Sequence, residues 1–149
     1  MVVTVGSKQQ MTQEQCIEAQ QMIKVIVSTS AMQQKFDQLE TKAGGDADEY
    51  HLLVSAMLMS EVYPTVCQNF GIPPDQVKAG TKLILGSIQR WSASSVAMTE
   101  AWLELETLMR NKRLMRAAEV AVSRVKAYQF ALENSPKQEE EEEEATKTD

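Results

Sequence analysis

The sequence predicts an all-α fold: a compact bundle of about five helices, with a long amphipathic C-terminal helix and a disordered acidic tail. Three observations lead to this prediction. Apolar residues recur three and four positions apart, no segment alternates apolar and polar residues as a strand does, and glycines and prolines concentrate around residues 44–45 and 71–74. The 149 residues, 43% of them apolar, are sufficient for one domain with a buried core.

The first two helices are expected at residues 13–27 and 31–43. Thr12 and Gln15 have the spacing of a capping box, in which each side chain accepts a hydrogen bond from the other residue's backbone. Residues 27–30, Val-Ser-Thr-Ser, interrupt the helix because β-branched and hydroxyl side chains compete for backbone hydrogen bonds. Ser30 and Gln33 then offer a second capping box.

A third helix is expected to begin after Asp46 or Asp48 and to lie at the centre of the bundle. Its predicted inward stripe comprises Leu52, Ala56, Met59, Tyr63, Val66 and Phe70, widened by Leu53, Met57, Leu58 and Val62. Pro64 removes one backbone donor, so the helix either bends there or a new helix begins. Gly71 suits the left-handed residue that ends a helix.

A fourth helix is expected to open at Pro73-Pro74-Asp75, and a fifth to extend over about residues 94–133. The inward face of the fourth comprises Val77, Ile84, Ile88 and Trp91, and its Gly80 and Gly86 suggest close contact between helices. In the fifth, a five-residue step breaks the apolar periodicity at residues 111–113. Either one long helix rotates its apolar face there, or it hinges.

Most of the charge lies outside the predicted bundle. The chain carries a formal net charge of −6, of which the segment 134–149 contributes −5, mainly through the six consecutive glutamates Glu139 to Glu144. Consecutive like charges repel and cannot form a core, so this segment is expected to be disordered. The predicted organisation is a flexible N-terminus over 1–11, one helical domain over 12–133 and the acidic tail over 134–149.

The order of these features resembles the small eukaryotic protein C-ten family over about residues 11–110. The resemblance rests on the opening Met-Thr-Gln-Glu-Gln of residues 11–15, the break near Ser28, the corner Phe70-Gly71-Ile72 and a following amphipathic helix that ends at Trp91. It implies a compact helical, cytosolic, eukaryotic protein without assigned chemistry, and it supplies no functional residues. Pro64, the Pro73-Pro74 pair and everything after Arg110 depart from the family pattern.

Catalytic, metal and cofactor chemistry find little support in the sequence. Cys16 and Cys67 lie in apolar segments without zinc or redox spacing, which indicates reduced, buried thiols in a cytoplasmic protein. The segment 46–51 contains Asp46, Asp48, Glu49 and the single histidine, His51. They make an incomplete metal-ligand set, and a capped helix start explains them as well. We therefore expect no enzyme activity, no cofactor and no metal. No apolar run reaches the roughly 20 residues of a membrane span.

Residues 62–86 have the spacing of a helix-turn-helix, with a small residue at Cys67, a glycine at Gly71 and an aliphatic residue at Val77. The exposed face of the second helix is poor in side chains that read bases, and residues 1–133 carry a net charge of only −1. Nucleic-acid binding by this segment is the alternative function, and a packed corner is the structural explanation of the same spacing.

Protein–protein interaction through the last helix is the expected function, that of a non-enzymatic adaptor or assembly subunit. Residues 110–126 carry a net charge of +5, and methionines lie beside the break in periodicity, where a partner could contact an uncovered stripe. A solvated basic face is the competing interpretation, and self-association through this helix is an open alternative. The candidate partner-binding residues are Met98, Met109, Arg110, Lys112, Arg113, Met115, Arg116, Arg124 and Lys126.

Overall fold

The computed structural model describes residues 10–135, and these residues form helices joined by short turns. The elements are α1 (Gln13–Val27), α2 (Ser30–Ala43), α3 (Ala47–Glu61), α4 (Tyr63–Asn69), the single 3-10 turn η1 (Pro74–Gln76), α5 (Val77–Ser92), α6 (Val96–Leu108) and α7 (Lys112–Glu133). The all-α prediction is confirmed for this part of the chain. The predicted tail beyond Ser135 and the predicted flexible residues 1–9 lie outside the described residues.

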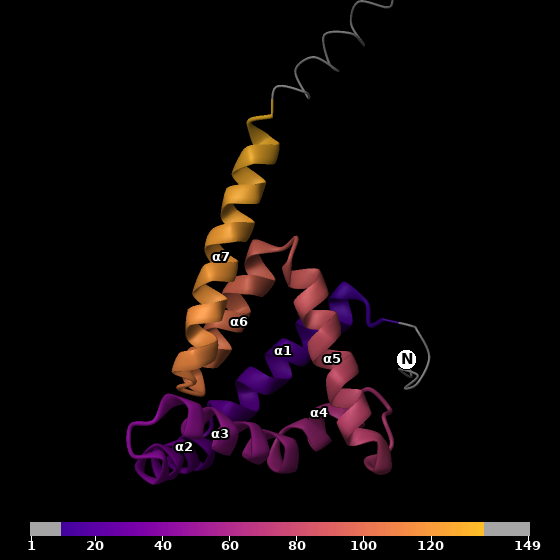
Figure 1. The fold of residues 1–149 in the computed structure, drawn as a ribbon. Helices are drawn as coiled ribbons and strands as arrows, with labels where there is room; N and C mark the ends of the chain where they lie inside the picture. Colours follow the sequence, from indigo (N-terminus) through magenta and orange to yellow (C-terminus); the bar gives the residue numbers. More distant parts are fainter. Residues whose placement is uncertain (1–9, 136–149) are drawn as a thin grey trace, which may run out of the picture.

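The central helix of the bundle is α1, which packs against α2, α4, α5 and α6 (Figure 1). Helices α3 and α4 follow one another along one end of the molecule. Helix α7 runs back along α6 in the opposite direction and continues past it, so that its C-terminal part projects from the body (Figure 1).

The described residues contain seven α-helices where about five were predicted, because two of the predicted helices are divided. The third divides at Val62, and Pro64 lies in the first turn of α4, where a missing N–H costs no helical hydrogen bond. The fifth divides at Arg110, which has a left-handed backbone with φ of 57°. At Pro64 the correct alternative is a new helix. Beside residues 111–113 neither alternative is correct, because α6 ends and α7 begins as a separate helix that runs in the opposite direction (Figure 1).

Helix starts follow the capping rules, with one shift in register. Thr12 and Gln15 form the predicted capping box, with N···O distances of 2.9 and 3.2 Å. Asp46 caps α3. The second predicted box is wrong, because Thr29 rather than Ser30 accepts from the Met32 N–H.

The predicted inward stripe of the third helix is confirmed for Leu58, Val62, Val66 and Phe70, which are buried, but it is wrong for the first half of the helix. The buried residues of α3 are Tyr50, Val54 and Leu58, whereas Leu52 is 63% exposed and Met59 is 38% exposed. Helix α3 contacts α2, α4 and α7, while Leu52, Ala56 and Met59 remain exposed on its other side, so the helix is not central. Because the helix is apolar around most of its circumference, its sequence does not distinguish the covered face from the exposed one.

The N-terminal boundary of the body lies one residue before the predicted Thr12. Met11 is 1% exposed. Its N–H donates to Ser87 Oγ at 3.3 Å, and its carbonyl accepts from Trp91 Nε1 at 2.9 Å. Met11 thereby attaches the segment just before α1 to α5.

The corner between α4 and α5 is a tightly packed turn. Gly71 has φ of 73°, and the following Ile72 N–H donates to the Cys67 carbonyl at 3.0 Å. Ile72 then folds back against Gly80, where an added Cβ would lie 2.7 Å from Ile72 Cγ2 and 3.3 Å from Cys67 Sγ. The close contact predicted at Gly80 is confirmed, whereas at Gly86 nothing lies within 4 Å of an added Cβ.

Gly80→Ala and Gly86→Ala should therefore change stability in opposite directions. At Gly80 the new methyl forces buried Ile72 to move, which should lower the free energy of unfolding by about 1–3 kcal/mol. At Gly86 the same change meets open space and should raise it by about 0.5–1 kcal/mol through helix propensity. Chemical denaturation of both variants checks this, and equal effects at the two positions would show that the corner is loosely packed.

Candidate interaction surface on the last helix

The turn between α6 and α7 is closed by backbone hydrogen bonds around Arg110. Just after the last residue of α6, the Met109 N–H donates to the Leu105 carbonyl at 2.9 Å and the Asn111 N–H donates to the Glu106 carbonyl at 3.0 Å. Asn111 then caps α7, because its Oδ1 accepts from the Leu114 N–H at 3.2 Å. The left-handed position is one that glycine usually occupies, so an arginine there indicates that its side chain has a structural role.

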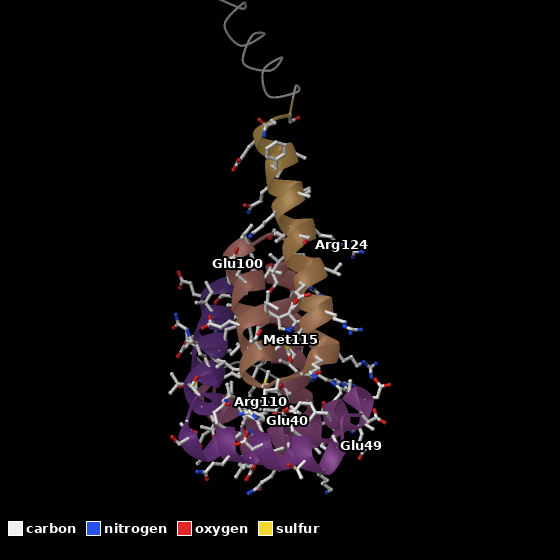
Figure 2. The ribbon with its side chains drawn as sticks, turned by 90° about the vertical axis from the view of Figure 1, so that its left-hand side faces the viewer. Glu40, Glu49, Glu100, Arg110, Met115 and Arg124 are labelled. Atoms are coloured by element: carbon white, nitrogen blue, oxygen red, sulfur yellow. The ribbon has the colours of Figure 1, made fainter. Side chains whose placement is uncertain are left out.

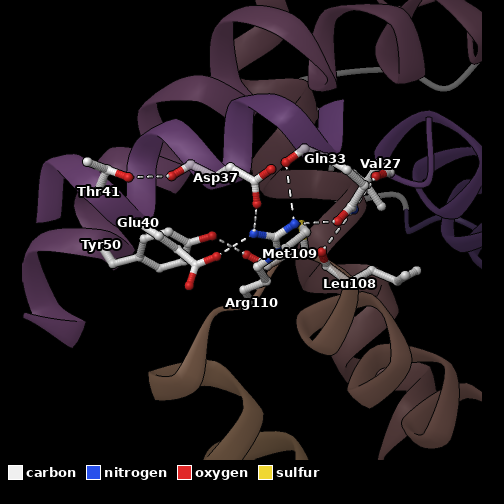
Figure 3. A network of polar contacts seen from close by, with 9 residues as sticks. All are labelled: Val27, Gln33, Asp37, Glu40, Thr41, Tyr50, Leu108, Met109 and Arg110. Atoms are coloured by element: carbon white, nitrogen blue, oxygen red, sulfur yellow. Dashed lines mark hydrogen bonds and ion pairs between the residues drawn. The ribbon is translucent and has the colours of Figure 1, made fainter. Parts of the chain in front are cut away.

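That side chain reaches across to α2. The Arg110 guanidinium forms ion pairs with Asp37 and Glu40, and its Nη2 donates to Gln33 Oε1 at 2.9 Å (Figure 3). Arg110 is only partly exposed, and the planar guanidinium suits a site that supplies several oxygen acceptors at once. We use the name corner clamp for two sets of contacts. The first is Arg110 with Gln33, Asp37 and Glu40 of α2; the second, described next, is formed by Gln33, Tyr50 and His51 with residues 108–111.

Further contacts tie the same turn to α2 and α3. Tyr50 OH donates to the Met109 carbonyl at 2.7 Å, and Gln33 Nε2 donates to the Leu108 carbonyl at 3.1 Å (Figure 3). Burial, with the nearby Glu40 carboxylate, raises the pKa of Tyr50 to about 12, so its hydroxyl remains a donor at neutral pH. Asn111 Nδ2 lies 3.0 Å from His51 Nδ1. The carbonyl groups at the C-terminus of α6 that have no partner within the helix therefore accept hydrogen bonds from side chains of α2 and α3.

The methionines do not form the uncovered stripe that the sequence suggested. Met98 is 2% exposed and Met109 is 4% exposed, because α1 and α7 cover α6 on two sides. Met115 is half-buried. As partner contacts, Met98 and Met109 are therefore corrected to core residues.

The six basic residues predicted as one face divide into two groups. Arg110 belongs to the corner clamp, and Lys126 Nζ lies 3.2 Å from Glu100 Oε1 of α6. Arg113 makes a longer contact of 3.6 Å with Asp48, both side chains being largely exposed. Lys112, Arg116 and Arg124 are exposed and form no ion pair with any residue of 10–135, and Arg124 points away from the body (Figure 2).

The projecting end of α7 exposes apolar side chains. Ala118 and Val125 are buried against the body, and the same helical face continues with Tyr128 and Leu132, which are 56% and 47% exposed. Phe130, on another side of the helix, is 68% exposed. We call Tyr128, Phe130 and Leu132 the apolar tip. The sequence contained this stripe, but the point where α6 ceases to cover it depends on the relative lengths of the two helices.

The other candidate chemistries have structural explanations in the described residues. Asp46 caps α3 and His51 contacts Asn111, and no group of three metal-ligating side chains occurs within residues 10–135. Cys16 and Cys67 are free and buried, as predicted, and burial raises the pKa of Cys16 to about 11. Among the helices described, none is long and apolar enough to cross a membrane.

One buried carboxyl was not predicted from the sequence. Glu106 of α6 is 6% exposed; its Oε1 accepts from Trp102 Nε1 at 3.2 Å, while its Oε2 has no hydrogen-bond partner. Burial raises the pKa of Glu106 to about 7, with the Trp102 hydrogen bond acting in the opposite direction. The same burial acts on Tyr63, whose pKa is raised to about 12, first by desolvation and then by Glu106.

Comparison of the chain with family models, with curated proteins and with solved structures found no match. The resemblance to the protein C-ten family therefore stays a prediction.

Glu106 should make stability depend on pH. The folded chain holds a proton there up to a pKa of about 7, whereas the unfolded chain releases it near 4.5, so the stability that this proton provides is lost as pH rises through this interval. Glu106→Gln is neutral at every pH and should gain about 3 kcal/mol of unfolding free energy relative to the native chain between pH 4.5 and 8.

Denaturation at several pH values measures this difference. Glu104→Gln is the matched control, since Glu104 lies on the same helix but is exposed beside Lys24. A Glu106→Gln difference that stays constant from pH 4.5 to 8 would contradict the assignment of a protonated Glu106.

Proposed function

We propose that the chain is a non-enzymatic helical adaptor or assembly subunit of the cytoplasm, and that the apolar tip of α7 docks into a hydrophobic groove of a protein partner. The observation that carries the proposal is the continuation of the buried face of α7 into Tyr128 and Leu132, where the body no longer covers it. Apolar residues four apart on one helical face are the anchors of helix-in-groove recognition.

The charges beside the tip favour a partner groove with an acidic rim. Arg124 and Lys126 lie within one or two turns of Tyr128, and Arg124 is free of ion pairs with the described residues. Opposite charges at the rim of an apolar contact accelerate encounter and fix orientation. Glu133 at the end of α7 is the nearest acid on the described part of the helix.

The helix is also preorganised for docking. The corner clamp holds the turn that leads into α7, and packing against α6 buries Ala118 and Val125 along its middle. A tip that is already helical loses less conformational entropy on binding than a segment that folds at the partner's surface.

The test uses the full chain immobilised and exposed to cytosolic extract, with bound proteins quantified by mass spectrometry. Tyr128→Ala with Leu132→Ala should reduce retention of the partner at least about tenfold, since interface anchors often contribute more than 1 kcal/mol each. Leu52→Ala is the control, because Leu52 is an exposed leucine on α3, away from the tip. Equal retention by all three chains would refute docking through the tip.

Sedimentation velocity of the purified chain identifies a homo-oligomer. Concentration-dependent association that the double variant loses would make a second copy the partner.

Nucleic-acid binding through α4 and α5 remains the second candidate, and one observation favours it. The exposed side of α5 carries Lys78, Lys82 and Arg90, none of which is ion-paired with a described residue. Duplex titrations at two salt concentrations test it: binding that weakens steeply with salt, and that Lys78→Gln with Lys82→Gln removes, would support this candidate over the tip.

A further inference from the structure

The outward side of α7 carries a row of arginines that the fold does not neutralise. Arg113, Arg116 and Arg124 are exposed and fall within about 80° of one another around the helix axis. This side is opposite the buried Ala118 and Val125. We call these three arginines the basic stripe; it is distinct from the apolar tip.

The acids of the described residues do not cover this stripe. Its one ion pair is the 3.6 Å contact between Arg113 and Asp48, whose side chains are 57% and 82% exposed. Glu119, the only acid of α7 before Glu133, lies about 60° or more around the helix from each of the three arginines. Arg110, Lys126, Lys24 and Lys35 have carboxylate partners. Lys112 at the start of the same helix is exposed and, like Arg116 and Arg124, forms no ion pair with a described residue, so this side of α7 is a local excess of positive charge.

We infer that the basic stripe is the docking surface of the chain's own acidic run, Glu139 to Glu144. Six consecutive carboxylates are complementary to three exposed guanidiniums, which bind carboxylates in a bidentate manner. The helix ends at Glu133, and Pro136 lacks the N–H that would continue it, so the chain direction is free to change before the acidic run.

The lengths of the two segments agree. At 1.5 Å per helical residue, Arg124 and Arg116 lie about 16 and 28 Å back along α7 from Ser135. An extended chain of about 3.3 Å per residue places Glu139 and Glu144 about 13 and 30 Å from the same point. These are the largest reaches that the chain allows, and each residue used for the reversal shortens them by about 3.3 Å, so the acidic run covers Arg124 and reaches Arg116 only at full extension.

The contact is electrostatic and largely exposed to solvent, so it is weak and sensitive to salt. While it persists, an acidic partner cannot use the stripe. The acidic run thus leaves the apolar tip uncovered, but it competes with the acidic rim of the proposed partner groove for Arg124.

Paramagnetic relaxation measured by NMR tests this on the full chain. A nitroxide is attached at Ala145→Cys; the native thiols of Cys16 and Cys67 are fully buried, and burial raises the pKa of both, so the introduced cysteine reacts selectively. At about 20 mM salt, amide signals of residues 113–127 should lose at least about half their intensity. They should recover at about 0.5 M, where the Debye length falls to a few ångströms.

Two variants decide whether the stripe is the cause. Arg116→Gln with Arg124→Gln should abolish the low-salt loss, whereas Lys78→Gln with Lys82→Gln, which removes the same charge from α5, should preserve it. Since all four side chains are exposed, neither variant should unfold the chain. No intensity loss in the native sequence, or an equal loss in both variants, would overturn the inference.

A mixed sample separates contact within one chain from contact between two. Spin-labelled chain without ¹⁵N is mixed with ¹⁵N-labelled chain that carries no nitroxide, and contact within one chain predicts unchanged amide intensities. Loss of intensity at residues 113–127 in this mixture would overturn the intramolecular contact and assign the acidic run to a second copy.

Discussion

The direction of α7 depends on one turn, in which Arg110 adopts a left-handed backbone and its side chain reaches α2. A non-glycine residue in this conformation costs about 1 kcal/mol or more, and the corner clamp offsets this cost. Asp37 and Glu40 pair with the guanidinium, while Tyr50 and Gln33 bind the last carbonyls of α6. This turn sets the angle at which α7 leaves the body. It therefore determines which sides of α7 pack against the body and which face solvent.

The division of charge along α7 follows from the same constraint. Once the turn places the helix against α6, Lys126 meets Glu100, Ala118 and Val125 become buried, and the arginines opposite them are left in solvent. Helix α7 has 22 residues and α6 has 13, so α7 extends beyond α6 and the apolar tip is exposed. The apolar tip and the basic stripe are therefore two consequences of one packing arrangement, and the two proposals place different ligands on them.

Local rules predicted the features that depend on a few neighbouring residues: the capping box at Thr12, the left-handed Gly71, and the close contact at Gly80. The orientation of α3, the burial of Met98 and the role of Arg110 depend on contacts between residues far apart in the sequence. An arginine in a left-handed turn has no local sequence signature, because its partners lie about 70 residues earlier. Buried Glu106 was missed for the same reason, since its charged type predicts exposure.

The distance distribution between α2 and α7 tests the role of the corner clamp most directly. Spin labels at Gln38→Cys and Ala131→Cys, both exposed positions, report by double electron–electron resonance how firmly α7 is held. We predict one narrow distribution in the native background and a clearly broader one in Arg110→Gln with Tyr50→Phe, which removes the ion pairs and the hydroxyl donor together. An equally narrow distribution at the same distance in both backgrounds would contradict the account, because α7 would then be held by its packing against α6 alone.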